Sequence, residues 1–231
     1  MQETKLKINE QISCESISQF HVYYLNREKS QGGGVALGVS NELESALIRE
    51  GDDDTEVISV KVFMEEVPIR AITAYAPQEN AAIEKKERFW DFLEKEAGDA
   101  EIEGDGLIIQ MDGNLHAGKE LIKNDPNQQN RNGRLFCEFL TRNPQLIVVN
   151  NLEICEGLIT RKRVVENRTQ EAVLDFFLVN EKCITYLHKI KIDEKKEYSV
   201  MNLSQLKKNK RIIETDHNAL ILDLKMKGKR T

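Results

Sequence analysis

The chain has 231 residues, 40% of them hydrophobic, and this length and composition suit one α/β domain with a substantial buried core. The formal net charge of -6 argues against a domain that coats nucleic acid through bulk electrostatics, although an acidic site filled by divalent cations stays compatible with it. No window approaches the roughly 18 consecutive apolar residues of a membrane span and no signal peptide follows Met1, so we expect an intracellular protein, nuclear or cytoplasmic, without a membrane partner.

Short apolar segments bounded by turn signals predict strands in the first third of the chain. They are rich in β-branched residues and run from Gly33 to Val39, from Val57 to Phe63 and from Val67 to Pro77. The connection Met64-Glu65-Glu66 between the second and third segments is short enough for a hairpin. We therefore expect these two strands to pair antiparallel.

From Asn80 onwards the apolar residues change to helical spacing. An amphipathic helix is predicted there, and a second helix begins near Asn132-Gly133. Further strands are predicted over Leu107 to Met111, Leu146 to Asn150, Val173 to Val179 and Ala219 to Leu224. Strands in pairs with interspersed helices predict an α+β fold in which two sheets pack together with helices outside.

Polar residues stand at the ends of several predicted strands. Asp112 and Asn114 follow an apolar strand in MDGN, where loops on a rigid scaffold often carry chemistry, although an Asx turn at Gly113 explains them equally well. Asp216 and His217 precede the last strand. An imidazole there can act as acid, base or phosphate donor, and a purely structural Asp-His pair is the alternative.

Asp175 interrupts the apolar run VLDFFLV, where an unpaired carboxylate would be costly to bury. We therefore expect it to have a partner, for which an imidazole is suitable. Tyr75 ends its strand in TAYAP, and when considered alone it is better explained as a buried structural tyrosine. Glu3, in QET, is an ordinary surface residue when considered alone.

Several short segments follow one another in a characteristic order. They are QET, GGGVAL, TAYAP, MDGN, NGRLFCEFL, VLDFFLVN and TDH, and their order and spacing resemble the exonuclease III/DNase I-like endonuclease/exonuclease/phosphatase superfamily over nearly the whole chain. MDGNLHAG, the NGRLFCEFL helix and TRKR before VLDFFLVN are most similar to the endonuclease domains of non-LTR (LINE-type) retrotransposons. The resemblance implies a four-layer α/β/β/α sandwich, with two mixed sheets packed face to face and outer helices.

The resemblance also implies catalytic roles in the hydrolysis of a phosphodiester bond. Asp112 would orient and deprotonate the attacking water, and Asn114 would position that water and the phosphate. Tyr75 would donate a hydrogen bond to a phosphate oxygen. His217, held by Asp175, would stabilise the charge that builds on the phosphorus-bound oxygens.

A divalent cation is the cofactor that the resemblance implies. Glu3 would bind Mg²⁺ or Mn²⁺, with Asp216 as a further metal-site carboxylate, because hard cations prefer carboxylate oxygen. The reaction in this family is an in-line hydrolysis that leaves a 3′-hydroxyl and a 5′-phosphate.

Two basic stretches could contact DNA. One precedes the Asp175 strand, where retrotransposon endonucleases carry a variable hairpin, and the other precedes TDH. Solvated loops without a partner are the alternative for both. The residues concerned are Arg161, Lys162, Arg163 and Arg168 in the first stretch, and Lys208 and Arg211 in the second.

The chain also departs from the family pattern. Relatives carry an earlier strand with a site asparagine, and a helix, before QET, so the resemblance implies a single domain over residues 1–231 that is truncated at its N-terminus. Gly113 replaces a bulkier residue within MDGN, and Thr73 stands where many relatives have asparagine.

Three hypotheses of function follow. The leading one is a DNA-nicking endonuclease whose 3′-hydroxyl product primes synthesis by a downstream reverse transcriptase domain, as in target-primed retrotransposition. The second is a catalytically inactive truncated copy that acts as a DNA- or protein-binding module. The third keeps the fold and changes the substrate to an abasic site or another phosphoester.

Overall fold

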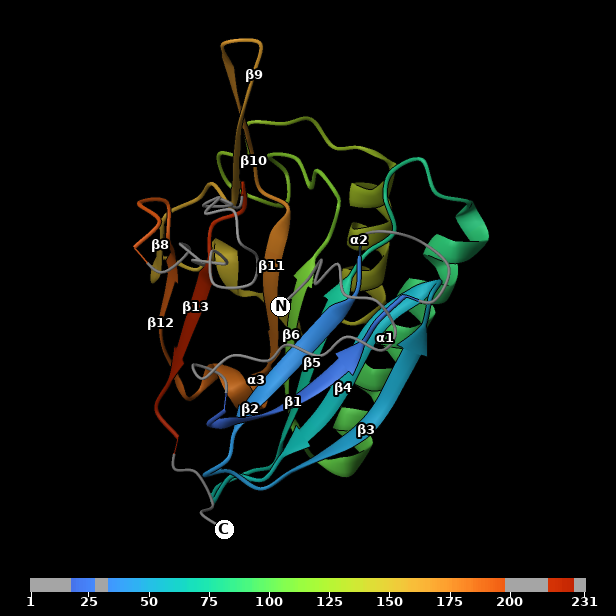
Figure 1. The fold of residues 1–231 in the computed structure, drawn as a ribbon, viewed down its shortest axis with the longest axis vertical. Helices are drawn as coiled ribbons and strands as arrows, with labels where there is room; N and C mark the ends of the chain where they lie inside the picture. Colours follow the sequence, from blue (N-terminus) through green and yellow to red (C-terminus); the bar gives the residue numbers. More distant parts are fainter. Residues whose placement is uncertain (1–17, 28–32, 198–215, 227–231) are drawn as a thin grey trace, which may run out of the picture.

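The computed structural model describes residues 18–27, 33–197 and 216–226. Figure 1 shows a mixed fold of many strands and few helices, from which the hairpin of β9 and β10 projects. The elements, in chain order, are β1 (Phe20–Leu25), β2 (Val35–Ser40), β3 (Ser45–Asp52), β4 (Thr55–Val62), β5 (Ile69–Tyr75), α1 (Ile83–Glu103), β6 (Gly106–Asp112), α2 (Arg131–Arg142), β7 (Leu146–Val148), the 3-10 helix η2 (Val149–Asn151), β8 (Cys155–Glu156), β9 (Arg161–Val165), β10 (Arg168–Ala172), β11 (Asp175–Asn180), α3 (Glu181–Ile184), β12 (Leu187–Ile192) and β13 (Leu220–Leu224).

A six-stranded mixed sheet in the order β3-β4-β5-β6-β11-β7 forms the centre. β4 and β5 pair antiparallel, as their short connection predicts. β5 and β6 pair in parallel across the α1 crossover, with Tyr75 opposite Asp112. β11 runs antiparallel to β6 and brings Asp175 opposite the same Asp112. The sheet register therefore gathers three polar residues at one edge.

Helices α1 and α2 cover one face of this sheet (Figure 1). Phe89, Trp90 and Leu93 of α1 are buried in one cluster with residues of β6 and α2. α1 ends at Gly104, whose φ of 76° is the left-handed conformation that suits glycine at a helix end. None of the helices in the described ranges is both long and apolar enough to cross a bilayer.

Strands cover the other face. The β1–β2 hairpin packs over β4 and β5, and the three-stranded sheet β13-β12-β8 packs over the β11 side. Within residues 18–27, 33–197 and 216–226 these are two separate small sheets. β4 and β5 are consequently buried on both faces, which explains their nearly continuous apolar sequences.

The mixed α/β fold expected from the sequence is confirmed, and so are its two long helices. The strand expected over Leu146 to Asn150 ends at Val148, because the Asn150 side chain bonds the backbone of Phe177 and Asp175 instead. β1, β3 and β12 were not predicted. β3 lies at the edge of the sheet with two register shifts and much exposed surface, so its sequence lacks a clear alternation.

Candidate active site

Three adjacent strands of the central sheet carry polar side chains at the same edge. Tyr75 ends β5, Asp112 ends β6 and Asp175 begins β11, and each is at most 9% exposed. Asp112 is the direct cross-strand partner of both other residues. Residues directly opposite one another in a sheet share a face and lie within contact distance. The sequence prediction that these residues act together is therefore consistent with their placement.

His217 joins this group from the segment before β13. Its Nδ1 lies 2.9 Å from Asp175 Oδ2 and 3.1 Å from Asp175 Oδ1. Its Nε2 lies 3.9 Å from Asp112 Oδ2. The expected imidazole partner of Asp175 is thus confirmed, and the ring lies between two carboxylates.

The surroundings of His217 favour its charged form. Burial lowers the pKa of the imidazole, but the hydrogen bond to Asp175 and the negative charges of Asp175, Asp112 and Asp216 raise the pKa to about 9. The ring is therefore a cation at neutral pH. A protonated imidazole donates from both nitrogens, which suits a phosphate ligand and argues against a role as base.

A residue that the sequence did not single out fixes Asp175. Thr160 is fully buried, and its Oγ1 accepts hydrogen bonds from the backbone N–H of Leu174 (2.8 Å) and Asp175 (3.0 Å). Its carbonyl accepts a further bond from Asn218 N, at 2.6 Å. Thr160 therefore joins the start of β11 to the segment that carries His217. Nothing in the sequence around GLIT signals this role.

The MDGN loop holds Asp112 from the other side. Asn114 has a φ of 43°, and its backbone N–H donates to Asp112 Oδ1 at 2.9 Å. Its Nδ2 donates to Ala76 O at 2.8 Å. The Asx turn is therefore present, and it lies within the candidate site. A Cβ at Gly113 would lie 2.7 Å from the Leu115 side chain, so a larger residue at this departure from the family pattern would require Leu115 to shift.

Two carboxylates and an imidazole are close enough together to hold a metal ion. One ligand atom each of Asp112, Asp175 and His217 lies within 4.8 Å of the others. Because His217 is bonded to Asp175 and favours its charged form, the two carboxylates are the donors that fit a hard divalent cation.

The other residues predicted to bind metal are placed differently. Asp216 Oδ2 accepts from Arg161 Nε at 2.8 Å, and although burial raises the pKa of Asp216, this pairing lowers it overall. Its carboxylate is not part of the three-residue cluster. Glu3 lies outside the described residues, as do Lys208 and Arg211.

The β9–β10 hairpin has two chemically different faces. Directly paired and alternate residues share a face, which places Arg161, Arg163 and Arg168 together. Lys162 lies on the opposite face, where its Nζ pairs with Glu171 at 2.8 Å. An isolated bridge between Arg161 and His217 connects the arginine face to the candidate site.

Comparison with known proteins identifies the fold. No protein-family model and no curated protein matches the chain. Solved structures do match, including the "3'-5' exonuclease (NExo) from Neisseria Meningitidis", with a TM-score of 0.64, 15% identity, and 96% of this chain and 87% of that chain covered. The chain has the DNase I-like fold.

Further similar structures share this DNase I-like fold. The endonuclease domain of TRAS1, described as a telomere-specific non-LTR retrotransposon, has a TM-score of 0.62 and 13% identity over 90% of this chain and 80% of that chain. The catalytic domain of Xenopus laevis APE2 has a TM-score of 0.65 and 14% identity over 93% and 78% of the respective chains.

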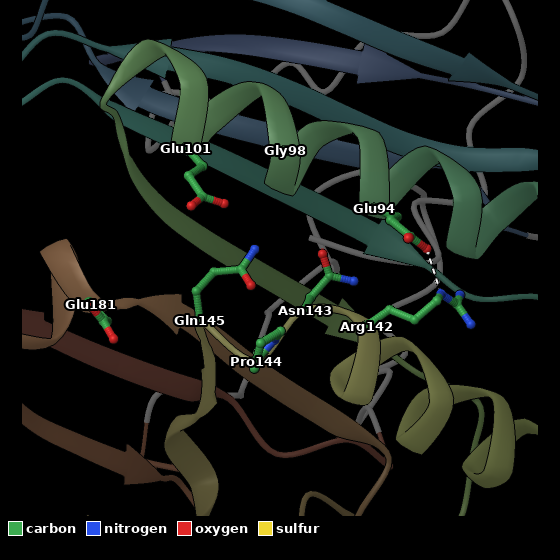
Figure 2. A pocket seen from close by; sticks show the side chains of 8 residues that line it. All are labelled: Glu94, Gly98, Glu101, Arg142, Asn143, Pro144, Gln145 and Glu181. Atoms are coloured by element: carbon green, nitrogen blue, oxygen red, sulfur yellow. Dashed lines mark hydrogen bonds and ion pairs between the residues drawn. The ribbon is translucent and has the colours of Figure 1, made fainter.

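A groove of about 630 Å³ lies elsewhere on the DNase I-like fold (Figure 2). Its lining comes from the outer side of α1, the end of α2 and the residue after β11: Glu94, Gly98, Glu101, Arg142, Asn143, Pro144, Gln145 and Glu181. Asp175 and Glu181 lie at opposite ends of β11, which at roughly 3.3 Å per residue are about 20 Å apart. The groove is therefore separate from the candidate active site.

Proposed function

We propose that this chain is a divalent-metal-dependent DNA endonuclease that cleaves phosphodiester bonds to leave a 3′-hydroxyl and a 5′-phosphate. The observation that carries the proposal is the convergence of Tyr75, Asp112, Asp175 and His217 at one edge of the central sheet. Carboxylates beside an imidazolium supply a base and a donor on the two sides of a reacting phosphate.

In this proposal Asp112 accepts the proton of the attacking water. Its Oδ1 accepts from the Asn114 backbone N–H, and its Oδ2 lies 3.9 Å from His217 Nε2. Asn114 positions the water and the phosphate, since its Nδ2 carries a second hydrogen beyond the one given to Ala76 O.

His217 donates a hydrogen bond to the phosphorus-bound oxygens and stabilises the charge that builds on them. Asp175 acts through His217, because it fixes the ring and keeps it protonated. Tyr75 donates its phenolic hydrogen to a phosphate oxygen. A bound Mg²⁺ or Mn²⁺ would act as Lewis acid beside this cluster, with Glu3 and Asp216 as the carboxylates that would hold it.

DNA binding is assigned mainly to the arginine face of the hairpin. Arg163 and Arg168 are exposed, and they lie on the face that leads to His217. Arginine suits phosphate because its planar guanidinium group can donate two hydrogen bonds at once. Lys162 carries a smaller share because Glu171 offsets its charge. Lys208 and Arg211 are proposed as further DNA contacts on their basic sequence alone.

The similar structures support a nucleic-acid substrate. One is the endonuclease domain of a non-LTR retrotransposon, and another was solved as a 3′ phosphatase bound to a product DNA hairpin. We place the present chain with the first, because its hairpin and its MDGN and NGRLFCEFL segments are similar to retrotransposon endonucleases. A reverse transcriptase domain would then extend the 3′-hydroxyl product.

The fold alone also accommodates abasic-site cleavage, and an AP endonuclease from Archaeoglobus fulgidus is among the similar structures. The test compares three substrates with Mg²⁺: supercoiled plasmid, a duplex with one abasic site, and a small phosphoester. Nicking of intact plasmid, with ends that a polymerase extends, supports the proposal. A strong abasic preference would assign the chain to repair, and binding of plasmid without cleavage of any substrate would leave a binding module.

A further inference from the structure

The first turn of α2 connects the two loops that carry the candidate site. Asn132, in this turn, is 3% exposed. Its Nδ2 donates to Asn114 O in the MDGN loop and to Pro77 O in the loop after β5, both at 2.9 Å. One carboxamide therefore ties the loop of Asp112 to the loop that follows Tyr75.

The orientation of this carboxamide follows from its neighbours. Both contacts are backbone carbonyls, which only accept hydrogen bonds, so the nitrogen of Asn132 must face them. An oxygen in that position would be repelled by both loops. The two loops are therefore joined by the hydrogen bonds that the Asn132 nitrogen donates, and an acceptor of the same size would not join them.

The helix end that carries Asn132 is itself fixed to both loops. Glu79, after β5, accepts from the backbone N–H of Arg131 and Asn132, at 3.1 Å each. Asn130 caps the helix through Gly133 N at 2.8 Å and also accepts from His116 N at 3.1 Å.

Close packing also holds this turn against the MDGN loop. A Cβ on Gly133 would lie 2.0 Å from His116 O, so the backbones pack too closely for any other residue. The turn of α2 that presents Asn132 is thus a rigid support.

We propose that Asn132 is a positioning residue for phosphodiester cleavage, and this inference rests on the proposed function. It holds the carbonyl of Asn114 while Asp112 holds the N–H of the same residue. Asn114 has a left-handed backbone, which a non-glycine residue keeps only where its surroundings fix it. Asn132 supplies that fixation, and through Asn114 it sets where the Asp112 carboxylate lies.

The test is the Asn132→Asp variant, which keeps the shape and removes the donor. Aspartate in the first turn of a helix is favoured by the helix dipole, so α2 itself is not weakened. We expect kcat for plasmid nicking to fall about 10- to 100-fold, as for a misplaced reacting group, with KM within about 2-fold of the wild-type value. The Asn132→Ala variant removes the same bonds without adding charge and must show the same loss of kcat.

A matched control stands at the other end of the helix. Asn143 is 4% exposed and its Nδ2 also donates to a backbone carbonyl, Phe139 O, at 2.9 Å. Asn143→Asp makes the same chemical change at the unfavourable end of the helix dipole, where it removes one hydrogen bond instead of two. It should keep the wild-type kcat.

Hydrogen exchange of the 112–117 backbone gives a readout that does not depend on activity. Faster exchange at Asn114 in Asn132→Asp, with no change in Asn143→Asp, supports the inference. A wild-type kcat in Asn132→Asp, or an equal loss of kcat in both variants, overturns it. A wild-type protein that cleaves nothing overturns the proposed function instead. Unchanged hydrogen exchange at Asn114 in Asn132→Asp would show that Asn132 does not hold the two loops together, and would overturn the inference independently of activity.

Discussion

Two groups of buried charged residues, one beneath α1 and one at the candidate site, are held in different ways. Beneath α1, Glu96 and Arg70 are both fully buried and bond each other at 2.9 Å. Arg49 contacts Glu96, and Glu103 pairs with Arg70 at 3.0 Å and with Lys61 at 2.7 Å. Although burial lowers the pKa of Arg70, its acidic neighbours raise it overall. The arginines and the lysine of this group balance the charges of its carboxylates.

The candidate site has one cation, His217, between two carboxylates, and neutral hydrogen bonds complete its support. A backbone N–H fixes Asp112, and the buried hydroxyl of Thr160 fixes the backbone of Asp175. The single imidazole of His217 lies 2.9 Å from one carboxylate and 3.9 Å from the other. One imidazolium shared by two carboxylates leaves a net negative charge. The buried charge beneath α1 stabilises the fold, whereas the charge at the candidate site suits a cation and a phosphate.

The largest expected effect is on the nicking rate, and it follows from a substitution in the candidate site. Asp112→Asn keeps the shape of the side chain but removes the base, so we expect nicking to fall at least about 1000-fold, equivalent to about 4 kcal/mol of transition-state stabilisation. The free energy of unfolding should stay the same or rise, because one of two neighbouring carboxylates loses its charge. Rates from a single-turnover nicking assay and urea denaturation of the same preparations check both parts.

The matching substitution in the structural cluster should do the reverse. Glu96→Gln removes the fully buried partner of Arg70 and leaves it paired with Glu103 at 3.0 Å. Breaking a buried pair costs up to roughly 3–5 kcal/mol. We expect a much lower free energy of unfolding, with a nicking rate per folded molecule close to that of the wild type. A stable Glu96→Gln protein would show that the two clusters do not differ as described.

The pH dependence of stability sharpens the comparison further. The folded-state pKa of His217, about 9, lies above the ordinary imidazole value near 6.5. The protonated ring therefore stabilises the fold fully below pH 6.5, and this stabilisation is lost as the pH rises through about 9. In EDTA, the stability advantage of the wild type over His217→Gln should therefore shrink between these pH values, by no more than about 3 kcal/mol. Denaturation curves at pH 6, 7.5 and 9 measure it, and a constant difference would contradict the assigned charge.

The smallest effect concerns the two faces of the hairpin. Arg163→Ala with Arg168→Ala removes two exposed charges from the arginine face, and the removal of each phosphate-binding charge should lower the magnitude of the salt slope of DNA binding by about 1. Lys162→Ala, a substitution on the opposite face, should change the slope less because Glu171 already offsets that charge. Equal effects of the arginine and lysine substitutions would show that the hairpin has no DNA-facing side.

Much of the site could be predicted from the sequence because its residues stand at strand ends. Asp112 follows a clear apolar strand and Asp175 interrupts another, so local pattern and the cost of burying a carboxylate pointed to both. The resemblance then connected His217 to them. Sheet register, which the sequence does not state, is what brings all of them to one edge.

The supporting residues could not be predicted in the same way. Asn132 stands in the NGRLFCEFL helix and resembles an ordinary residue of a first turn, and its two carbonyl partners are 18 and 55 residues away. Arg70 and Glu96 are separated by 26 residues on a strand and a helix, and residue type alone predicts an exposed charge for each. Such roles depend on tertiary contacts that no local pattern encodes.

The central claim is that the carboxylates at the sheet edge act with a divalent cation on DNA. The measurement that tests it most directly is the nicking rate of supercoiled plasmid by the wild-type protein with Mg²⁺, after EDTA, and after Mg²⁺ is restored, beside folded Asp112→Asn. The account predicts nicking that EDTA abolishes, that Mg²⁺ restores and that the variant lacks. Nicking that survives EDTA, or that is equally fast in Asp112→Asn, would contradict it.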